Sequence, residues 1–206
     1  GLPHQTTQDL ARTVDQIVAL APDRVTVFGY AHVPWMKRHQ RMIDEAALPG
    51  ADARIEQADA AAERLVGHGY QRIGMDHFAR PGDPMARALN EGHLHRNFQG
   101  YTTDAADTLI GLGVSSIGAL PAGYAQNTDD LNQYREHIEA GRLPIARGVA
   151  LSDDDRLRRA IIERLMCDHA VDLAALCARF DQPVAAIVDA YDALNELADD
   201  GLVEID

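Results

Sequence analysis

The sequence lacks long hydrophobic runs and has few cysteines. No stretch of about 18 apolar residues occurs, and nothing resembles a secretory signal peptide, so we expect no membrane span. The only cysteines, Cys167 and Cys177, are ten residues apart within helical patterns. Two thiols make no disulfide framework, and we expect both to be small core residues. Because nothing here demands an oxidising compartment, we expect a cytoplasmic protein.

Motifs of several large enzyme classes are also absent. There is no GxSxG nucleophile elbow, no Walker loop, and no GxGxxG motif after a predicted strand. The nearest glycine doublet, Gly111 and Gly113, precedes a predicted strand and is interpreted as a turn. Neither cysteine lies beside a histidine at a strand end, which argues against a cysteine nucleophile.

The charge of the chain is strongly negative. Thirty-two acidic and 19 basic residues give a formal net charge of −13. An acidic chain repels phosphate backbones, so we expect no nucleic-acid partner. The apolar share of 46% is ordinary for a globular protein, and 206 residues are enough to bury a sizeable core.

Residues 1–150 alternate helical and strand patterns. Helices are expected at residues 7–20, 50–66 and 129–140, and strands at residues 24–31, 71–79 and 114–122. This order predicts parallel βα units in an α/β fold. Because three strands are too few to close a barrel, we expect an incomplete (β/α) barrel. Its open sheet edges would need covering, which makes self-association through them a hypothesis.

Residues 151–206 change to an almost purely helical pattern. Three short helices followed by a strand start at residues 202–205 resemble a winged helix, so we expect a small second domain. The third predicted helix, within residues 183–200, contains no Lys or Arg and carries Asp189, Asp192, Glu196, Asp199 and Asp200. A helix of this kind does not suit a DNA major groove, and we expect the domain to pack on or cover the catalytic domain.

Several histidines leave a metal-site hypothesis open. Asp76 and His77 are expected at the C-terminal end of a strand, where β/α barrels place their active sites. His93 and His95 form an HxH pair, a pattern found among metal ligands. An HxH pair alone is a weak signal because three or four ligands must converge. A metal-dependent hydrolase using these four residues therefore stays as an alternative.

Six longer motifs occur in a fixed order along the chain. They are GYAHVP at residues 29–34, GMDHFARP at 74–81, HLHRNFQGYTT at 93–103, GVSSIG at 113–118, YAQN at 124–127 and RGVALSDDDRLRR at 147–159. Together they resemble the oxygen-independent coproporphyrinogen III oxidases, a radical S-adenosylmethionine family, over nearly the whole chain. A haem-chaperone paralogue carries an Asn–Tyr–Trp signature in place of RNFQGYTT, whereas the only tryptophan here is Trp35. The resemblance therefore favours the oxidase over a haem-binding or chaperone-type paralogue.

The resemblance implies a reaction and its cofactors. The family converts two propionates of coproporphyrinogen III to vinyl groups by oxidative decarboxylation, which yields protoporphyrinogen IX for haem biosynthesis. A [4Fe-4S] cluster reduces S-adenosylmethionine to a 5′-deoxyadenosyl radical, which abstracts hydrogen from the propionate β-carbon. The cofactors carry the difficult chemistry, while the protein positions and shields them.

Matching motif positions imply individual roles. Ala31 and Ile117 match positions that contact S-adenosylmethionine, although both would also suit buried strand positions. Phe98 and Gln99 match positions linked to activity near the cofactor, with a loop-bracing role as the alternative for Gln99.

Four further residues are inferred to face the substrate. Arg96 and Arg80 could each hold a propionate, because a guanidinium forks onto a carboxylate, but a structural salt bridge is an equal alternative for either. His32 and His77 follow predicted strands and could donate hydrogen bonds to a carboxylate.

The sequence departs from the family pattern at the cluster. The family holds its cluster with three cysteines in a CxxxCxxC loop, and this sequence has no such loop. Gly1 is not a start methionine. We therefore expect the C-terminal part of a longer enzyme, with the cluster ligands and the N-terminal half of the barrel outside this chain. The final domain is also expected to be truncated, because Asp206 comes before a winged-helix hairpin would be complete.

Anaerobic reconstitution of the purified chain with iron and sulfide tests this interpretation. We expect neither a stoichiometric cluster nor turnover, because two cysteines in the wrong place cannot replace three thiolates. Visible absorption spectroscopy measures the outcome. A charge-transfer band equivalent to one cluster per chain would contradict it.

Overall fold

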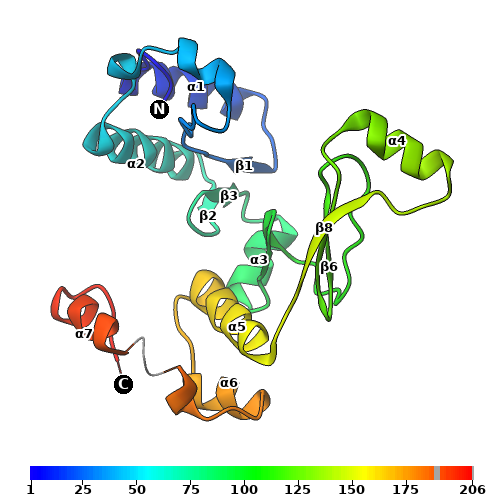
Figure 1. Cartoon of the computed structure of the whole chain (residues 1–206). Helices are drawn as coiled ribbons and strands as arrows, with labels where there is room; N and C mark the ends of the chain where they lie inside the picture. Colours follow the sequence, from blue (N-terminus) through cyan, green and yellow to red (C-terminus); the bar gives the residue numbers. More distant parts are fainter. Residues whose placement is uncertain (188–190, 206) are drawn as a thin grey trace. The chain divides into compact units, whose positions relative to one another are not determined.

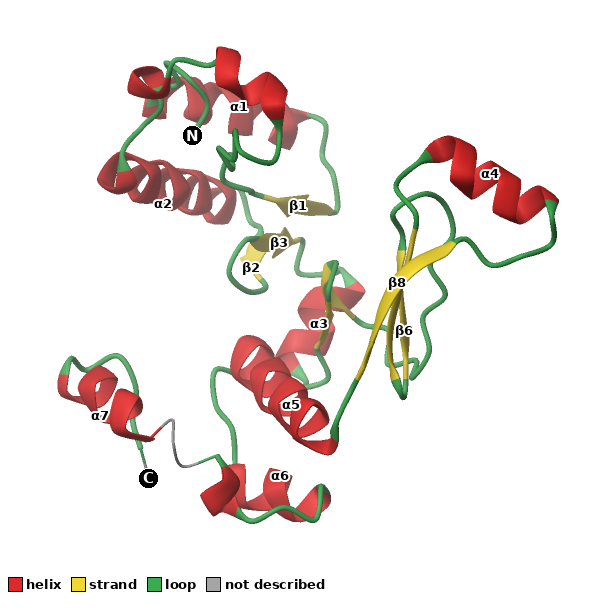
Figure 2. Ribbon diagram, in the orientation of Figure 1, coloured by secondary structure: helices red, strands yellow, loops and turns green. Residues whose placement is uncertain are grey.

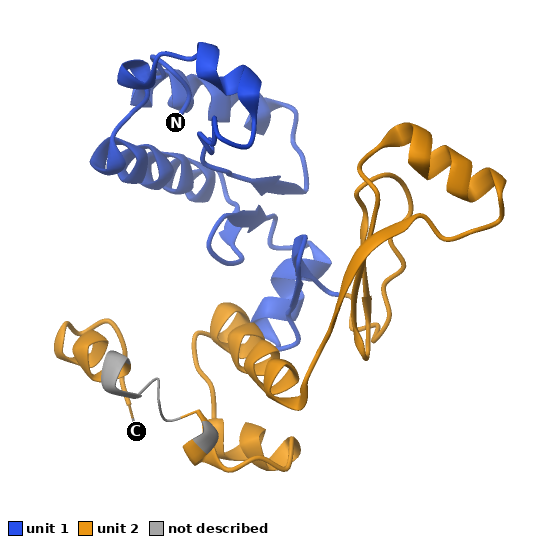
Figure 3. Ribbon diagram, viewed as in Figure 1, with its two compact units in different colours: residues 1–103 blue, residues 104–206 orange. Residues whose placement is uncertain are grey.

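The computed structural model describes residues 1–187 and 191–205, arranged in two compact units. The first unit is Gly1–Thr103 and the second is Asp104–Asp206 (Figure 3). Figure 1 gives the order of the helices and strands. No helix among the described residues is both long and apolar enough to cross a membrane.

Two helices form the largest part of the first unit. Helix α1, Thr7–Ala19, begins with a capping box in which Thr6 and Asp9 bond reciprocally. Helix α2, Ala51–Gly67, starts after Gly50 as predicted. Their apolar faces meet in one core cluster together with Tyr70 and Phe78. Figure 2 shows both helices in red. Their positions agree with the helices predicted at residues 7–20 and 50–66.

The sheet of the first unit corrects the predicted strand direction. Strands β1 (Arg24–Thr26), β2 (Gln71–Arg72) and β3 (His77–Ala79) lie in the order β1-β3-β2, with both pairs antiparallel. The expected continuous strand at residues 71–79 is broken at Gly74, and the chain reverses there into a hairpin. A four-residue connection permits only antiparallel pairing. Strands β1 and β2 still run in the same direction, with β3 inserted between them.

Short elements complete the first unit. They are the 3-10 helices η1 (Arg38–Met42) and η2 (Glu45–Ala47), helix α3 (Pro84–Asn90), and strands β4 (His95–Asn97) and β5 (Gly100–Thr102), which form an antiparallel hairpin. Asp83 caps α3 by accepting a bond from the Met85 N–H at 2.7 Å, and it also accepts from Arg24 Nε at 2.9 Å. One carboxylate therefore joins β1 to the start of α3.

The second unit begins with an antiparallel meander that was only partly predicted. Strand β6, Ile117–Leu120, is the core of the strand expected at residues 114–122. Strands β7 (Gly123–Asn127) and β8 (Ile145–Ala150) follow it in the order β6-β7-β8 and were not expected. Helix α4, Leu131–Glu139, lies between β7 and β8 in the chain, where a helix was predicted. All six residues of β8 are exposed.

The helices after residue 151 are short and share a small core. Helix α5, Asp153–Asp168, starts with a Ser152–Asp155 capping box, and α6 covers Leu173–Arg179. Leu157, Ile161 and Cys177 form their buried cluster together with Ile187. A 3-10 turn, η3, covers Val184–Ala186, and α7 covers Tyr191–Asp199. Part of the third predicted helix, with Asp189, falls at residues 188–190, outside the described residues.

The expected final strand is wrong. Residues 202–205 have no regular secondary structure, so the winged-helix resemblance extends only to the helices. An apolar pattern of four residues forms a strand only when a neighbouring strand takes up its hydrogen bonds. The domain boundary expected between residues 150 and 151 stays a prediction. The two compact units of the structure divide at a different place, between residues 103 and 104.

Substitution of Asp83 tests the junction between β1 and α3. Asp83→Ala is expected to lower the free energy of unfolding by about 1 kcal/mol through the lost cap, measured by chemical denaturation. Asp83→Asn keeps a capping oxygen and should lose less. Little or no difference between Asp83→Ala and the parent chain would contradict the described junction.

The pH dependence of this effect has a defined sign. Burial raises the pKa of Asp83, but hydrogen bonds from Arg24 and the Met85 N–H, with the charges of Arg24 and Arg87, outweigh it and hold the pKa below 3.8. The stability from the ionised carboxylate is therefore present above the ordinary carboxyl pKa and is lost as pH falls through the lowered value. The gap between parent and Asp83→Asn should close only in that acid range.

Candidate functional site

The segment that carries Ala31 and His32 is an irregular loop. The strand expected to reach Ala31 ends at Thr26, and residues 27–33 have no regular secondary structure. His32 therefore does not directly follow a strand, contrary to expectation, and Ala31 is exposed rather than part of a strand core. A backbone outside a sheet needs other hydrogen-bond partners. Side chains supply them here.

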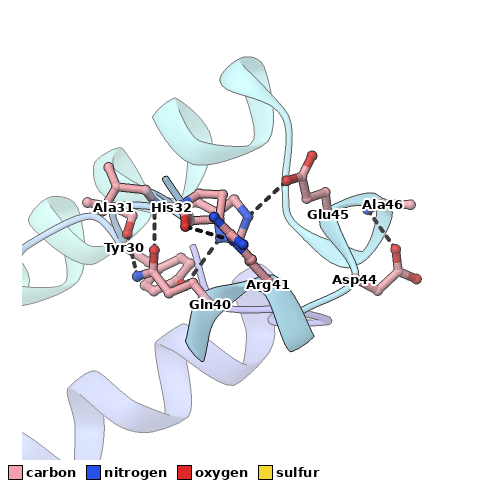
Figure 4. A network of polar contacts seen from close by, with 10 residues as sticks. Tyr30, Ala31, His32, Gln40, Arg41, Asp44, Glu45 and Ala46 are labelled. Atoms are coloured by element: carbon pink, nitrogen blue, oxygen red, sulfur yellow. Dashed lines mark hydrogen bonds and ion pairs between the residues drawn. The ribbon is translucent and has the colours of Figure 1, made fainter. Parts of the chain in front are cut away.

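Gln40 on η1 provides two of these partners. Its Nε2 donates to the Ala31 carbonyl at 3.0 Å, and its Oε1 accepts from the Val33 N–H at 2.6 Å (Figure 4). The side chain is buried, with 8% of the residue exposed. One planar amide thus bonds to both sides of His32 in the way a neighbouring strand would. Gln40 carries no motif signal in the sequence, and its role was missed.

Two arginines donate hydrogen bonds to carbonyls within this loop and just after it. Arg54 of α2 donates from Nη2 to the Tyr30 carbonyl at 2.9 Å. Arg41 of η1 donates from Nε to the Pro34 carbonyl at 3.3 Å (Figure 4). The loop is therefore fixed to two different helices, although it belongs to neither.

The His32 ring is engaged on both nitrogens. Nε2 lies 3.1 Å from Glu45 Oε1, and Nδ1 lies 3.4 Å from the Tyr30 hydroxyl (Figure 4). Asp44 caps η2 through the Ala46 N–H at 3.0 Å and so positions Glu45. A substrate carboxylate at His32 would have to replace Glu45, whose side chain is 73% exposed.

His77 lies at the start of β3 and not at a strand's C-terminal end, which corrects the predicted position. The reason is the chain reversal after Gly74, which places Asp76 just before β3 and His77 as its first residue. Asp76 Oδ1 lies 2.7 Å from Nδ1 and orients the ring. The rings of Tyr101 and Phe28 meet His77 edge to face at centroid distances of 5.2 and 6.4 Å.

The β4–β5 hairpin carries Phe98 and Gln99 at its tip. Asn97 pairs with Gly100, so these two residues form the entire connecting loop. Asn97 Oδ1 accepts from the Gln99 N–H at 2.8 Å, and Gly100 takes a φ of 129°, a conformation that favours glycine. Phe98 is 41% exposed and Gln99 is also exposed. Both side chains are thus presented on a short, well-defined turn.

Close approaches at two glycines seat this hairpin against the β2–β3 turn. A methyl group at Gly100 would lie 2.8 Å from His77 Nε2, and one at Gly74 would lie 2.2 Å from the Tyr101 ring. Neither position has room for a larger residue. These close contacts fix the hairpin tip relative to His77.

The two candidate arginines lie in different surroundings. The Arg96 guanidinium lies 4.7 Å from the centroid of Tyr101, so Arg96, Tyr101 and His77 share one cluster. Arg80 follows the opposite end of β3, where its Nε donates to the Pro22 carbonyl at 3.3 Å and its guanidinium covers Tyr70 at 5.1 Å. The structure therefore brings only Arg96 of the two into contact with the cluster around His77.

Ile117 belongs to the second unit. It begins β6 opposite Gln126 and is half-buried. Gly111 approaches its backbone, where a methyl group would lie 2.9 Å from the Ile117 carbonyl. Ile117 is thus a fixed strand-end residue with part of its surface exposed.

In the part of the chain that the structure describes, the two cysteines are not placed to hold an iron–sulfur cluster together. Cys167 and Cys177 are each 1% exposed and lie in a helical core. Within residues 1–187 and 191–205, no three His, Cys, Asp or Glu side chains are grouped so as to hold a metal ion. His93 of the HxH pair is largely exposed and lies 3.8 Å from Glu91.

The similarity of this chain to known proteins covers its full length. A Bradyrhizobium diazoefficiens protein named oxygen-independent coproporphyrinogen III oxidase is 52% identical over 206 residues, which is 100% of this chain and 46% of the relative. The relative of the same name from Escherichia coli K12 is 42% identical over 207 residues, 45% of its length. The family model described as the HemN C-terminal domain matches residues 151–206. This chain matches the C-terminal part of oxygen-independent coproporphyrinogen III oxidases.

A solved structure agrees with this match. The Escherichia coli protein whose title reads coproporphyrinogen III oxidase (HemN), a radical SAM enzyme, superposes with a TM-score of 0.91 at 42% identity. It is matched over 100% of this chain and 48% of its own. The chain thus spans about half the length of its relatives. The predicted resemblance to the oxidase family is confirmed, and the comparisons favour neither the chaperone nor the hydrolase alternative.

Substitution at Gly74 tests the packing of the hairpin against the β2–β3 turn. Gly74→Ala is expected to cost about 1–3 kcal/mol of the free energy of unfolding, because the methyl group would overlap the Tyr101 ring. Gly82→Ala is the matched control, since nothing lies within 4 Å of its added methyl group. Denaturant unfolding of both variants measures the difference. Equal stability of the two variants would contradict the described contact.

Proposed function

We propose that the protein containing this chain is an oxygen-independent coproporphyrinogen III oxidase, which oxidatively decarboxylates two propionates of coproporphyrinogen III to give protoporphyrinogen IX. The observation that carries the proposal is 52% identity over all 206 residues to a relative of that name. The chain would contribute part of the substrate and cofactor surfaces of that enzyme.

The cluster of Arg96, Tyr101, His77 and Asp76 supports a substrate-binding role. Its guanidinium and imidazole can both donate hydrogen bonds to a propionate carboxylate. The carboxylate of Asp76 orients the imidazole, and Tyr101 packs between Arg96 and His77. Arg80 remains a second candidate for substrate binding, although its guanidinium lies at Pro22 and Tyr70, apart from this cluster.

The cofactor side of the proposal rests on four residues. When bound, S-adenosylmethionine together with a [4Fe-4S] cluster would supply the one-electron chemistry of such an enzyme. Ala31 presents an exposed, small side chain on a fixed loop, which suits close approach of a cofactor. Phe98 and Gln99 on the hairpin tip and Ile117 at the start of β6 would add apolar and hydrogen-bonding contacts. The cluster ligands would come from outside these residues.

A groove along α2 is a poor candidate for the substrate. Acidic side chains line most of it, namely Asp52, Glu56, Asp59 and Glu63. A porphyrinogen that carries propionates would be repelled there by like charge. The groups that favour carboxylate binding lie at the hairpin instead.

Other features of the oxidase remain predictions. We infer that a preceding barrel half completes the sheet, that the enzyme acts in the cytoplasm, and that no nucleic acid takes part. Self-association through the open sheet edges also stays a hypothesis, and sedimentation of the chain as a monomer would count against it.

A hybrid protein tests the proposed function. In it, residues 1–206 replace the corresponding C-terminal part of the Bradyrhizobium diazoefficiens relative. After anaerobic reconstitution, the hybrid is expected to form protoporphyrinogen IX from coproporphyrinogen III, measured as porphyrin fluorescence after oxidation. A folded, cluster-containing hybrid without this activity would contradict the proposal.

Two matched variants of the hybrid locate the substrate site. Arg96→Gln is expected to raise the substrate KM about tenfold, because a charge-assisted hydrogen bond to a propionate is lost. Arg80→Gln should mainly lower stability. The reverse ranking of the two KM values would assign the propionate to Arg80.

A further inference from the structure

The Ala31 loop depends on side chains rather than on a sheet for its conformation. Residues 27–33 lack regular secondary structure, yet the Val27 N–H bonds to the Asp76 carbonyl at 2.9 Å at one end. At the other end the Val33 carbonyl accepts from the N–H groups of Met36 and Lys37 at 2.9 and 2.8 Å. Between these anchors, Gln40 is the residue that bonds to two backbone groups of the loop.

The backbone and the side chain of Gln40 are both held in place by hydrogen bonds. Gln40 lies within η1, where its own N–H donates to the Lys37 carbonyl at 2.9 Å and its carbonyl accepts from Ile43 at 3.0 Å. With main chain and side chain both bonded, and 8% of the residue exposed, its amide has little freedom to turn. Removing a buried amide with both ends bonded is costly, because two backbone groups of the loop lose their partners at once.

We propose that Gln40 is a positioning residue for S-adenosylmethionine binding, because its amide holds the Ala31 carbonyl and the Val33 N–H and so fixes the backbone that presents Ala31. This inference rests on the proposed function, in which Ala31 contacts the cofactor. Gln40 itself does not touch the cofactor. It acts through the loop, and its loss would raise the fraction of molecules in which Ala31 is displaced.

The chain offers a closely matched control in Gln57. Gln57 is also buried, at 5% exposed, and its Nε2 donates to the Gln5 carbonyl at 2.8 Å. It lies in the same unit but bonds to a segment that carries no predicted cofactor contact. Gln40→Met and Gln57→Met each replace a buried amide by an unbranched side chain of similar length. Gln40→Met loses the bonds to Ala31 and Val33, and Gln57→Met loses the bond to Gln5.

The experiment uses the hybrid protein with three readouts, namely the exchange rate of the Val33 amide by mass spectrometry, the KM for S-adenosylmethionine and kcat. Gln40→Met is expected to speed Val33 exchange at least tenfold and to raise KM about five- to tenfold, with a smaller change in kcat. Gln57→Met should leave Val33 exchange and KM unchanged. Gln40→Asn, whose shorter amide cannot span both groups, should shift both quantities in the same direction and serves where Gln40→Met does not fold.

The outcomes separate this inference from the proposed function. Unchanged KM in a Gln40 variant whose Val33 amide exchanges faster would overturn the positioning role, while the parent hybrid's activity would still support the proposed function. An equal rise of KM in Gln57→Met would overturn it too, because the effect would then be general loss of stability. A parent hybrid that binds no S-adenosylmethionine contradicts the proposed function and the positioning role together.

Discussion

Backbone groups that lie outside any sheet need hydrogen-bond partners from elsewhere, and this need determines the structure of the candidate site. Residues 27–33 leave the sheet after β1, and their polar groups are taken up by side chains from η1 and α2. Each of these hydrogen bonds contributes about 1 kcal/mol, and together they define where the loop can lie. The exposed Ala31 is therefore carried by an irregular segment that nevertheless has one preferred path.

A second constraint comes from glycine. The β4–β5 hairpin can lie against the β2–β3 turn only because Gly74 and Gly100 leave room for Tyr101 and His77. This contact places Arg96 and the Phe98–Gln99 tip on one rigid support with Asp76 and His77. Polar and aromatic side chains of the β2–β3 and β4–β5 hairpins thus come together, although every strand involved is short.

The sequence predicts the helices better than the strands. Helices α1, α2 and α4 have clear periodicity, and each was expected near its observed position; α5 lies in the region expected to be helical. Strand direction was wrong because a two- or three-residue strand carries no pattern that distinguishes a hairpin from a crossover. The motifs led to Ala31, His77 and Arg96 as candidates. Gln40 lies outside every motif, and Tyr101, although it lies within HLHRNFQGYTT, was not predicted to contact them. Those contacts depend on how distant segments pack, and no local pattern records that.

The central proposal is that the Ala31 loop, the hairpin tip and the start of β6 each contribute contacts to S-adenosylmethionine. Hydrogen–deuterium exchange of the cluster-loaded hybrid, with and without saturating S-adenosylmethionine, tests it most directly. We predict slower exchange in peptides covering residues 27–34, 97–100 and 117–120, with no change along α2. Saturation with cofactor that leaves all three peptides unaffected would contradict the claim.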